Sequence, residues 1–207
     1  ETGRLSSSKN PKRGGANGQN QDREIRNMFV PDVGHVFLEV DMSQAEDRIV
    51  KTLAASLLPP GPRRDELLWR ARAQPWENDE HIRAAVAIFK VLAHEITKQQ
   101  RYMGKRARHA GNYDQHGTGL SEVLLKDGIV ILPTEGERMI TAVIDDDTPE
   151  VRVYQREIRK RVMAERRLVN SWGRELSFEW VRLDDDAYRR GYAFLPQSSV
   201  PAILNQY

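Results

Sequence analysis

A proline-rich break at residues 59–62 (PPGP) divides the chain into two parts that cannot share one continuous helix or strand. Before the break, residues 35–40 (HVFLEV) have the composition of a β-strand, and Asp41 stands at its carboxyl end. Residues 44–57 then carry apolar side chains at helical spacing, and the prolines end that helix. The sequence therefore predicts a strand–carboxylate–helix unit followed by a second, separate region.

Beyond the break the patterns are mostly helical. Apolar residues recur at intervals of three or four over residues 82–96, and a mainly basic helix is expected from about Lys98 to Asn112. A helix is next expected near Glu135, opened by a Thr134/Glu137 capping box, and another from Glu150 to about Arg167 after Thr148-Pro149. Residues 168–181 predict a short hairpin or paired turns. A helix capped by Asp185 or Asp186 should then stop before Pro196, and a final helix should begin near Ser199 and Pro201.

Composition limits the classes of protein that the chain can represent. Apolar residues make up 39% and charged residues 30%, a mix that still supplies a core. The absence of cysteine excludes disulfides, thiolate zinc sites and cysteine nucleophiles. The longest apolar runs are a few residues, against the ~20 that a membrane helix needs. We expect no membrane contact and a cytoplasmic location, for a chain that is a fragment or a processed piece.

The net charge of +2 conceals strong local patterning. Basic residues dominate residues 83–108 and 152–174, whereas acids gather in two triple-aspartate runs at 145–147 and 184–186, which we expect to cap helices and meet solvent. Such an alternation of basic and acidic segments suits a protein that binds a polyanion on some surfaces and repels it from others. Solvated helix faces are the alternative interpretation of the charge pattern alone.

Asp41 is the first candidate for chemistry. An aspartate directly after a strand has a fixed backbone and a side chain that reaches the adjoining cleft, which suits a ligand of a divalent metal ion. Capping of the next helix is the simpler alternative for the same residue.

A second candidate is a stripe with a spacing of four residues, formed by Arg101, Lys105, His109 and Tyr113. On a helix these four side chains share one broad face. Two cations followed by two rings would make a platform for a triphosphate and a base, because the cations neutralise phosphate charge and the rings offer stacking surface. A basic stripe can also be a solvated helix face.

These segments together resemble the DNA polymerases of family A, the bacterial DNA polymerase I family. Residues 1–8 (ETGRLSSS) resemble its opening palm motif, residues 41–48 (DMSQAEDR) its motif A, usually DYSQIELR, and the 101–113 stripe its motif B, the fingers O-helix. Smaller similarities follow in the family's order: Gln19-Asn20, Arg26 to Phe29, Glu80-His81, Trp172-Gly173-Arg174 and Ala193 to Gln197. The resemblance covers essentially the whole chain.

The resemblance implies an α+β fold: a partial polymerase palm, with an antiparallel sheet plus helices, and an inserted, mostly helical fingers subdomain. Residues 1–58 would form the palm portion with motif A, residues 59–183 the fingers with motif B, and residues 184–207 the return to the palm.

The implied function is template-directed DNA synthesis, with nucleotidyl transfer from a dNTP to a primer 3′-OH by a two-metal mechanism. Asp41 would bind both Mg²⁺ ions, with the Met42 carbonyl as an additional ligand, and Glu46 would exclude a ribose 2′-OH from the sugar pocket. The second carboxylate belongs to motif C, a His-Asp-Glu segment that would lie beyond Tyr207. We therefore expect this chain alone to be inactive and a polymerase segment with motif C to be a partner.

The resemblance also implies roles around the nucleotide and the DNA. Arg101 and Lys105 would grip the triphosphate, and Lys105 could serve as general acid for the departing pyrophosphate. The other implied contacts are His81 to the triphosphate, His109 beside the deoxyribose, Tyr113 against the template base or the sugar gate, and Arg4, Arg174 and Gln197 to primer–template DNA.

Several positions depart from the family pattern. Met42, Ala45 and Asp47 stand where the family usually has Tyr, Ile and Leu, and His109 and Asp114 are also less common. Such choices resemble divergent phage-type members, which suggests a viral or metagenomic origin. Two alternatives remain open at this point: a relative of the single-subunit RNA polymerases, which Glu46 disfavours, and a non-catalytic module that binds primer–template or nucleotide.

Overall fold

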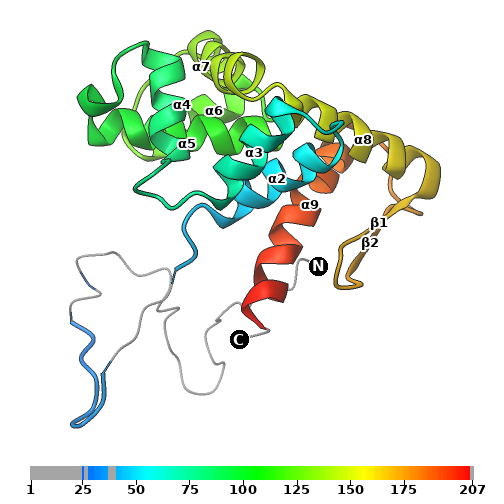
Figure 1. Cartoon of the computed structure of the whole chain (residues 1–207), viewed down its shortest axis with the longest axis horizontal. Helices are drawn as coiled ribbons and strands as arrows, with labels where there is room; N and C mark the ends of the chain where they lie inside the picture. Colours follow the sequence, from blue (N-terminus) through cyan, green and yellow to red (C-terminus); the bar gives the residue numbers. More distant parts are fainter. Residues whose placement is uncertain (1–24, 26–27, 37–40, 206–207) are drawn as a thin grey trace.

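The computed structural model describes residues 25, 28–36 and 41–205 of the chain, and over these residues helices dominate (Figure 1). The elements in chain order are α2 (Ala45–Ser56), α3 (Pro62–Arg72), α4 (Glu80–Phe89), the 3₁₀ turn η2 (Ala93–Glu95), α5 (Lys98–Asn112), α6 (Gly117–Lys126), α7 (Pro133–Thr141), the π-helix η3 (Ala142–Asp147), α8 (Glu150–Glu165), β1 (Arg167–Val169), β2 (Glu175–Ser177) and α9 (Asp185–Leu204).

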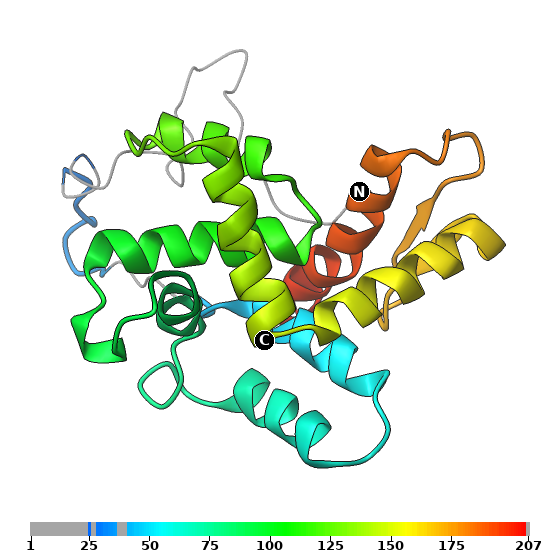
Figure 2. The same ribbon diagram turned by 90° about the horizontal axis from the view of Figure 1, so that it is seen from above.

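Helix α2 forms the centre of one group of elements. It packs against α3, α8 and α9, and α8 lies beside α9 in both Figure 1 and Figure 2. Val50 and Ala54 of α2 are fully buried in this contact, as are Tyr154 and Ile158 of α8. Sequence reasoning located α2 and the end that the prolines impose on it, but it missed α3, whose first residue is one of those prolines.

Helix α5 forms the centre of the second group, in which it contacts α4, α6, α7 and η3. It begins after a capping box between Thr97 and Gln100 and spans the predicted residues. Its closest neighbour is α4, because Gly104 lets the two backbones meet: a Cβ there would lie 2.6 Å from the carbonyl oxygen of His81. The contact between α5 and α2 brings the two groups together.

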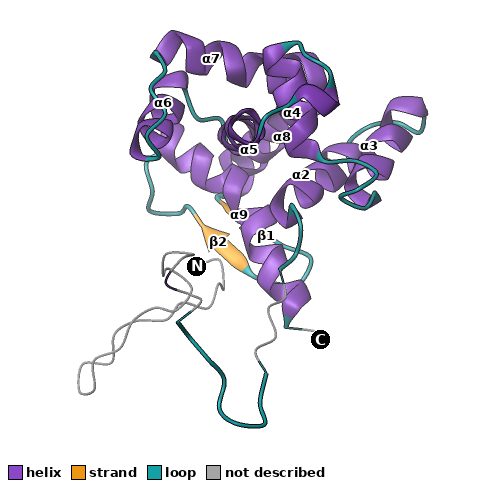
Figure 3. Cartoon of the chain, turned by 90° about the vertical axis from the view of Figure 1, so that its left-hand side faces the viewer, coloured by secondary structure: helices purple, strands orange, loops and turns teal. Residues whose placement is uncertain are grey.

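The strands confirm the predicted hairpin. β1 and β2 form an antiparallel pair (Figure 3), in which Leu168 lies opposite Leu176. Together with the helices they give the expected α+β class. The strand predicted over residues 35–40 falls largely outside the described residues, which omit 37–40.

Three boundaries differ from the prediction. The apolar pattern over 82–96 does not form one helix, because α4 ends at Phe89 and Lys90 takes a left-handed backbone conformation. Helix α7 begins with Pro133 at its first turn, so Thr134 does not cap it. The Glu137 carboxylate instead accepts a hydrogen bond of 2.7 Å from the Gly117 backbone, which joins α7 to α6.

Helix α9 is the largest correction. It is a single helix that continues through Pro196 and Pro201 rather than two helices separated before Pro196, and Asp184 caps it in place of the two predicted aspartates. Proline cannot donate to the carbonyl four residues earlier, which for Pro196 is that of Tyr192. The Tyr154 hydroxyl donates to this Tyr192 carbonyl at 2.8 Å, so the acceptor that Pro196 leaves without a helical donor is satisfied by another helix.

Among the helices that the structure describes, none is both long and apolar enough to cross a membrane.

Candidate active site

The site begins with the turn that leads into α2. Gln44 has a left-handed backbone, and its side-chain oxygen accepts a hydrogen bond of 3.2 Å from the Glu80 backbone at the start of α4. Arg48 fixes the same turn from behind, since its guanidinium donates to the Ser43 carbonyl at 2.9 Å and to two carbonyls at the end of α3, those of Ala71 (3.0 Å) and Ala73 (2.7 Å). The loop with Asp41 and Met42 is thereby attached to α3 and α4.

The amino end of α4 supplies the next side chains. Asp79 caps α4 through the His81 and Ile82 backbones, and its other carboxylate oxygen accepts two hydrogen bonds from Arg101 at 2.7 and 2.9 Å. Burial lowers the pKa of His81 to about 4, and the nearby Arg101 and Lys105 act in the same direction against Asp79. His81 is therefore neutral at pH 7.

The carboxyl end of α5 meets the first turn of α2. The Tyr113 hydroxyl donates to a Glu46 carboxylate oxygen at 2.5 Å, and His109 Nδ1 lies 3.9 Å from that same oxygen. The rings of His109 and Tyr113 make an edge contact with centroids 4.8 Å apart. Gln155 of α8 donates to the last carbonyls of α5, so this end of the helix is held on two sides.

These elements enclose a pocket of about 610 Å³. Seven predicted site residues line it: Asp41, Met42, Glu46, His81, Arg101, Lys105 and His109. Val200 and Leu204 of α9 complete the wall. Lys105 is exposed and forms no hydrogen bond or ion pair with any residue that the structure describes, so its ammonium group is available to a ligand.

The remaining predicted residues lie outside the pocket lining. Tyr113 lies just behind it, bonded to Glu46. Gln197 is three residues before Val200 on α9, hence on the same side of that helix. Arg174 lies in the loop of the β1–β2 hairpin, where its backbone N–H donates to Asn170, and Arg4 is outside the described residues.

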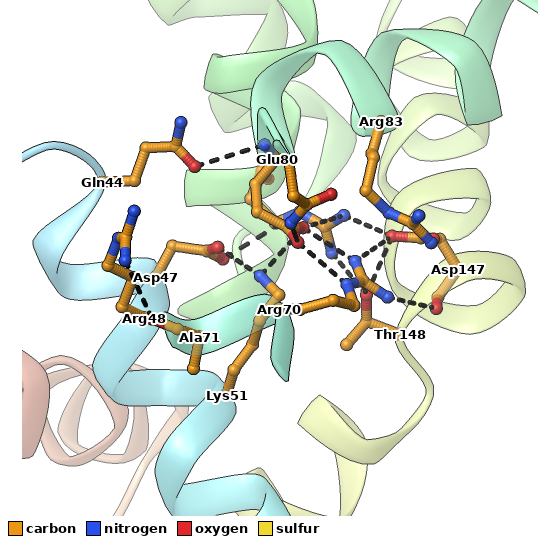
Figure 4. Close-up of polar contacts among 12 residues, drawn as sticks. Gln44, Asp47, Arg48, Lys51, Arg70, Ala71, Glu80, Arg83, Asp147 and Thr148 are labelled. Atoms are coloured by element: carbon orange, nitrogen blue, oxygen red, sulfur yellow. Dashed lines mark hydrogen bonds and ion pairs between the residues drawn. The ribbon is translucent and has the colours of Figure 1, made fainter. Parts of the chain in front are cut away.

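A cluster of buried charged side chains lies next to the pocket (Figure 4). Sequence reasoning did not predict this cluster. Its acids are Asp47, Glu80 and Asp147, and its buried cations are Lys51, Arg70 and Arg108. Arg70 donates to both Glu80 oxygens at 2.8 and 2.7 Å, and Arg108 donates to Asp147 at 2.5 Å. Three negative and three positive charges therefore balance among five different elements.

The cluster corrects the interpretation of one acidic run. Asp147 was expected to cap or to meet solvent, but it accepts hydrogen bonds from Arg70, Arg83 and Arg108. Burial alone would raise the pKa of Asp147, yet the Arg108 and Arg70 guanidinium groups hold this pKa far below its usual range. Thr148, expected to cap α8, instead bonds the two buried arginines through its hydroxyl.

Asp47 joins the cluster to the pocket. It forms an ion pair with Lys51 and accepts a hydrogen bond of 3.0 Å from Asn112, and Asp47, Arg108 and Asn112 also line the pocket. Burial alone would raise the pKa of the Asp47 carboxyl. The positive charges of Lys51 and Arg108 outweigh this effect, so the pKa lies below its usual value. An aspartate at this position, where the motif usually has leucine, is thus explained by its cationic neighbours.

The donor set at the pocket can be compared with the needs of Mg²⁺. Over the described residues no group of three His, Asp or Glu side chains converges on one point. Asp41 and Met42 nevertheless line the pocket, and a carboxylate and a backbone carbonyl are hard oxygen donors. Mg²⁺ is commonly held by one or two carboxylates together with waters and substrate phosphates, so these donors fit one side of a nucleotide-bound Mg²⁺ site.

Known proteins are similar to this chain in fold and in sequence profile. No curated protein sequence matches the chain. Among solved structures, it is similar to the POL domain of Pol1 from M. smegmatis in complex with DNA primer-template and dNTP, with a TM-score of 0.62 and 21% identity. The similarity covers 79% of this chain and 27% of that one, so the chain spans about a quarter of the solved protein and shares its fold over that part. The family profile described as DNA polymerase family A matches residues 1–193, and the chain therefore belongs to DNA polymerase family A.

Proposed function

We propose that this chain forms the palm and fingers portion of a template-directed DNA polymerase and binds the incoming dNTP in the 610 Å³ pocket. One observation carries the proposal: the pocket joins the oxygen donors of the motif A loop to the cations of α5, two segments that are 60 residues apart in sequence. Residues 1–58 and 184–207 would belong to the palm and residues 59–183 to the fingers. A cytoplasmic setting, including that of a phage host, is part of the proposal.

The cationic side of the pocket would receive the triphosphate. Lys105 has no acidic partner among the described residues, so a phosphate oxygen can become that partner without breaking an existing pair. Arg101 is held by Asp79 on one side and remains 43% exposed on the other. Neutral His81 can donate one hydrogen bond to phosphate without adding charge.

The proposed reaction forms a bond between the primer 3′-oxygen and the α-phosphorus and breaks the bond to pyrophosphate. The primer hydroxyl loses a proton to solvent, and Lys105 donates one to the departing pyrophosphate. When bound by Asp41 and the Met42 carbonyl, Mg²⁺ supplies positive charge to the phosphates and lowers the pKa of the attacking hydroxyl. The proposal includes a second Mg²⁺ ion and a second carboxylate ligand, which a motif C segment would supply.

The sugar would face the Glu46–Tyr113 pair. This pair is a fixed contact at the junction of α2 and α5, with His109 against it, and a ribose 2′-OH would compete with it for space. The pair supports deoxyribonucleotide selection and disfavours a relative of the RNA polymerases. Primer–template DNA would be contacted by Arg4, Arg174 and Gln197.

Nucleotide binding by the chain itself is the first test. Lys105→Ala should weaken dNTP affinity about tenfold or more in calorimetry, since a charge-assisted bond is worth about 1.5–3 kcal/mol. Lys126→Ala is the matched control, because Lys126 is also exposed but lies on α6 outside the pocket. Equal affinity of the two variants would contradict the proposed pocket.

Catalysis is tested by joining a related motif C segment after Tyr207 and measuring primer extension with Mg²⁺ and dNTPs. Extension that disappears with Asp41→Ala supports the enzyme. A folded fusion that binds primer–template and dNTP but makes no product would instead favour a non-catalytic binding module.

A further inference from the structure

We infer a second nucleic-acid contact on the solvent side of α8, at Arg156, Arg159 and Lys160, which we name the α8 basic face. Its ligand is the phosphate backbone of the DNA strand beyond the nucleotide pocket. The inference rests on the proposed function, because it assumes that DNA occupies the pocket.

The three cations share one side of the helix. Their spacing of three and four residues places them opposite the buried Ile158 and Val162. Together with Met163 and Ala164 they line a shallow hollow of about 400 Å³. Three cations beside the apolar side chains of Met163 and Ala164 suit a sugar–phosphate chain better than an isolated anion.

The charges of the face are available for a ligand. None of the three forms an ion pair with an acid among the described residues, although Glu157 lies within the same turn. Glu157 is instead bonded to Arg161 at 2.8 Å, on a different side of α8. The whole chain carries only two more basic than acidic residues, so the face is a local concentration of charge rather than a general excess.

Arg159 is held in place before any ligand binds. Its guanidinium carbon lies 4.1 Å from the centre of the Tyr188 ring at the start of α9. A cation that is already ordered against an aromatic ring loses less conformational entropy on binding phosphate than a free side chain does.

Helix α9 extends from the α8 basic face to the pocket and so gives the separation of the two sites. Tyr188 lies under Arg159 near the start of α9, and Val200 lines the pocket twelve residues later. At 1.5 Å per residue the two points are about 18 Å apart, which corresponds to at least about five nucleotides at 3.4 Å each. A strand that leaves the pocket must therefore be longer than this to reach the face.

The salt dependence of DNA binding tests the inference. Each lost phosphate contact lowers the slope of log K against log salt by about 0.9 for duplex DNA and about 0.7 for a single strand. The triple variant Arg156→Gln, Arg159→Gln, Lys160→Gln should therefore lose about two to three units of slope on long DNA. On DNA that extends fewer than about five nucleotides from the pocket it should match the wild type. Long duplexes and long single-stranded overhangs, compared separately, identify which strand is held.

Arg161→Gln is the matched control for each single variant, because it also removes one positive charge from the same helix but from a residue paired with Glu157. The single variants and Arg→Lys replacements, checked by circular dichroism, separate loss of charge from loss of fold. An unchanged slope for the folded triple variant on long DNA overturns the inference, as does binding of a poly-glutamate peptide in place of DNA. If the proposed function alone fails, Lys105→Ala leaves dNTP affinity unchanged while the slope still depends on the α8 basic face.

Discussion

Replacing Asp47 with leucine, the usual residue of motif A, should strongly destabilise this chain. The change leaves the Lys51 ammonium, only 1% exposed, with Glu80 as its one remaining ion-pair partner among the residues that the structure describes. It also removes the Asp47 acceptor of the Asn112 amide. The cluster would then carry three cations and two acids. Removing one partner from a buried ion pair costs about 3–5 kcal/mol, because the other charge stays desolvated.

The structure also specifies the compensating change. With Lys51→Met added to Asp47→Leu, both charges are gone and the space is filled by apolar atoms of similar volume, so most of the lost stability should return. Urea unfolding followed by circular dichroism gives the free energy of each variant. For a domain of this size the single change should lower Tm by about 6–20 °C.

A double-mutant cycle over the two positions should give a coupling energy of about 2 kcal/mol or more. Asp186→Asn, at an exposed aspartate early in α9, is the control and should change stability by less than about 0.5 kcal/mol. The reasoning fails if Asp47→Leu costs under about 1 kcal/mol, or if the double variant is no more stable than the single one.

Three further predictions concern packing and protonation. Gly104→Ala should lower the free energy of unfolding by about 1–3 kcal/mol in the same assay, because the new Cβ meets the His81 carbonyl. Gly119→Ala is the control: this glycine has open space around it, so the change should be neutral or stabilising. Equal effects of the two changes would refute the close contact at Gly104. Tyr154→Phe should cost about 1–3 kcal/mol by leaving the Tyr192 carbonyl without a donor, and a smaller cost would mean that another group satisfies it. The folded-state pKa of His81, about 4, lies below the unfolded value near 6.5, so stability is complete above pH 6.5 and should fall by up to about 3 kcal/mol as the pH approaches 4. His81→Gln should flatten this part of a stability–pH profile, and an unchanged profile would contradict the assignment.

Local patterns predicted the elements that local rules determine. Helix α5 was located because its four-residue stripe repeats over a few consecutive turns. The hairpin was located because its strands are adjacent in sequence. Local patterns singled out Asp41 and the Arg101–Tyr113 stripe as separate candidates. Only the family resemblance indicated that they belong to one site, since no local rule brings residue 41 to residue 105.

The ion cluster could not be predicted, because its members are distributed over a hundred residues and each alone looks like an ordinary surface charge. Only the fold brings Asp47 to Arg108 and Arg70 to Asp147. The continuity of α9 could not be predicted for the same reason, because it depends on a contact between distant residues. Local rules predict that a helix breaks at Pro196, but the hydroxyl of Tyr154 in α8 replaces the hydrogen-bond donor that this proline lacks.

The Glu46–Tyr113 contact fixes the carboxyl end of α5 to α2. This end is therefore the fulcrum, the point about which α5 would tilt. Arg101 lies twelve residues away along the helix, a lever arm of about 18 Å. A tilt of about 10° around the fulcrum would move Arg101 by about 3 Å, the length of one hydrogen bond. Because Gly104 packs α5 directly on α4 and Arg101 is bonded to Asp79, the two helices would swing together. The proposed affinity of this pocket for a phosphate would therefore depend on the tilt angle of α5 as much as on the identity of its side chains.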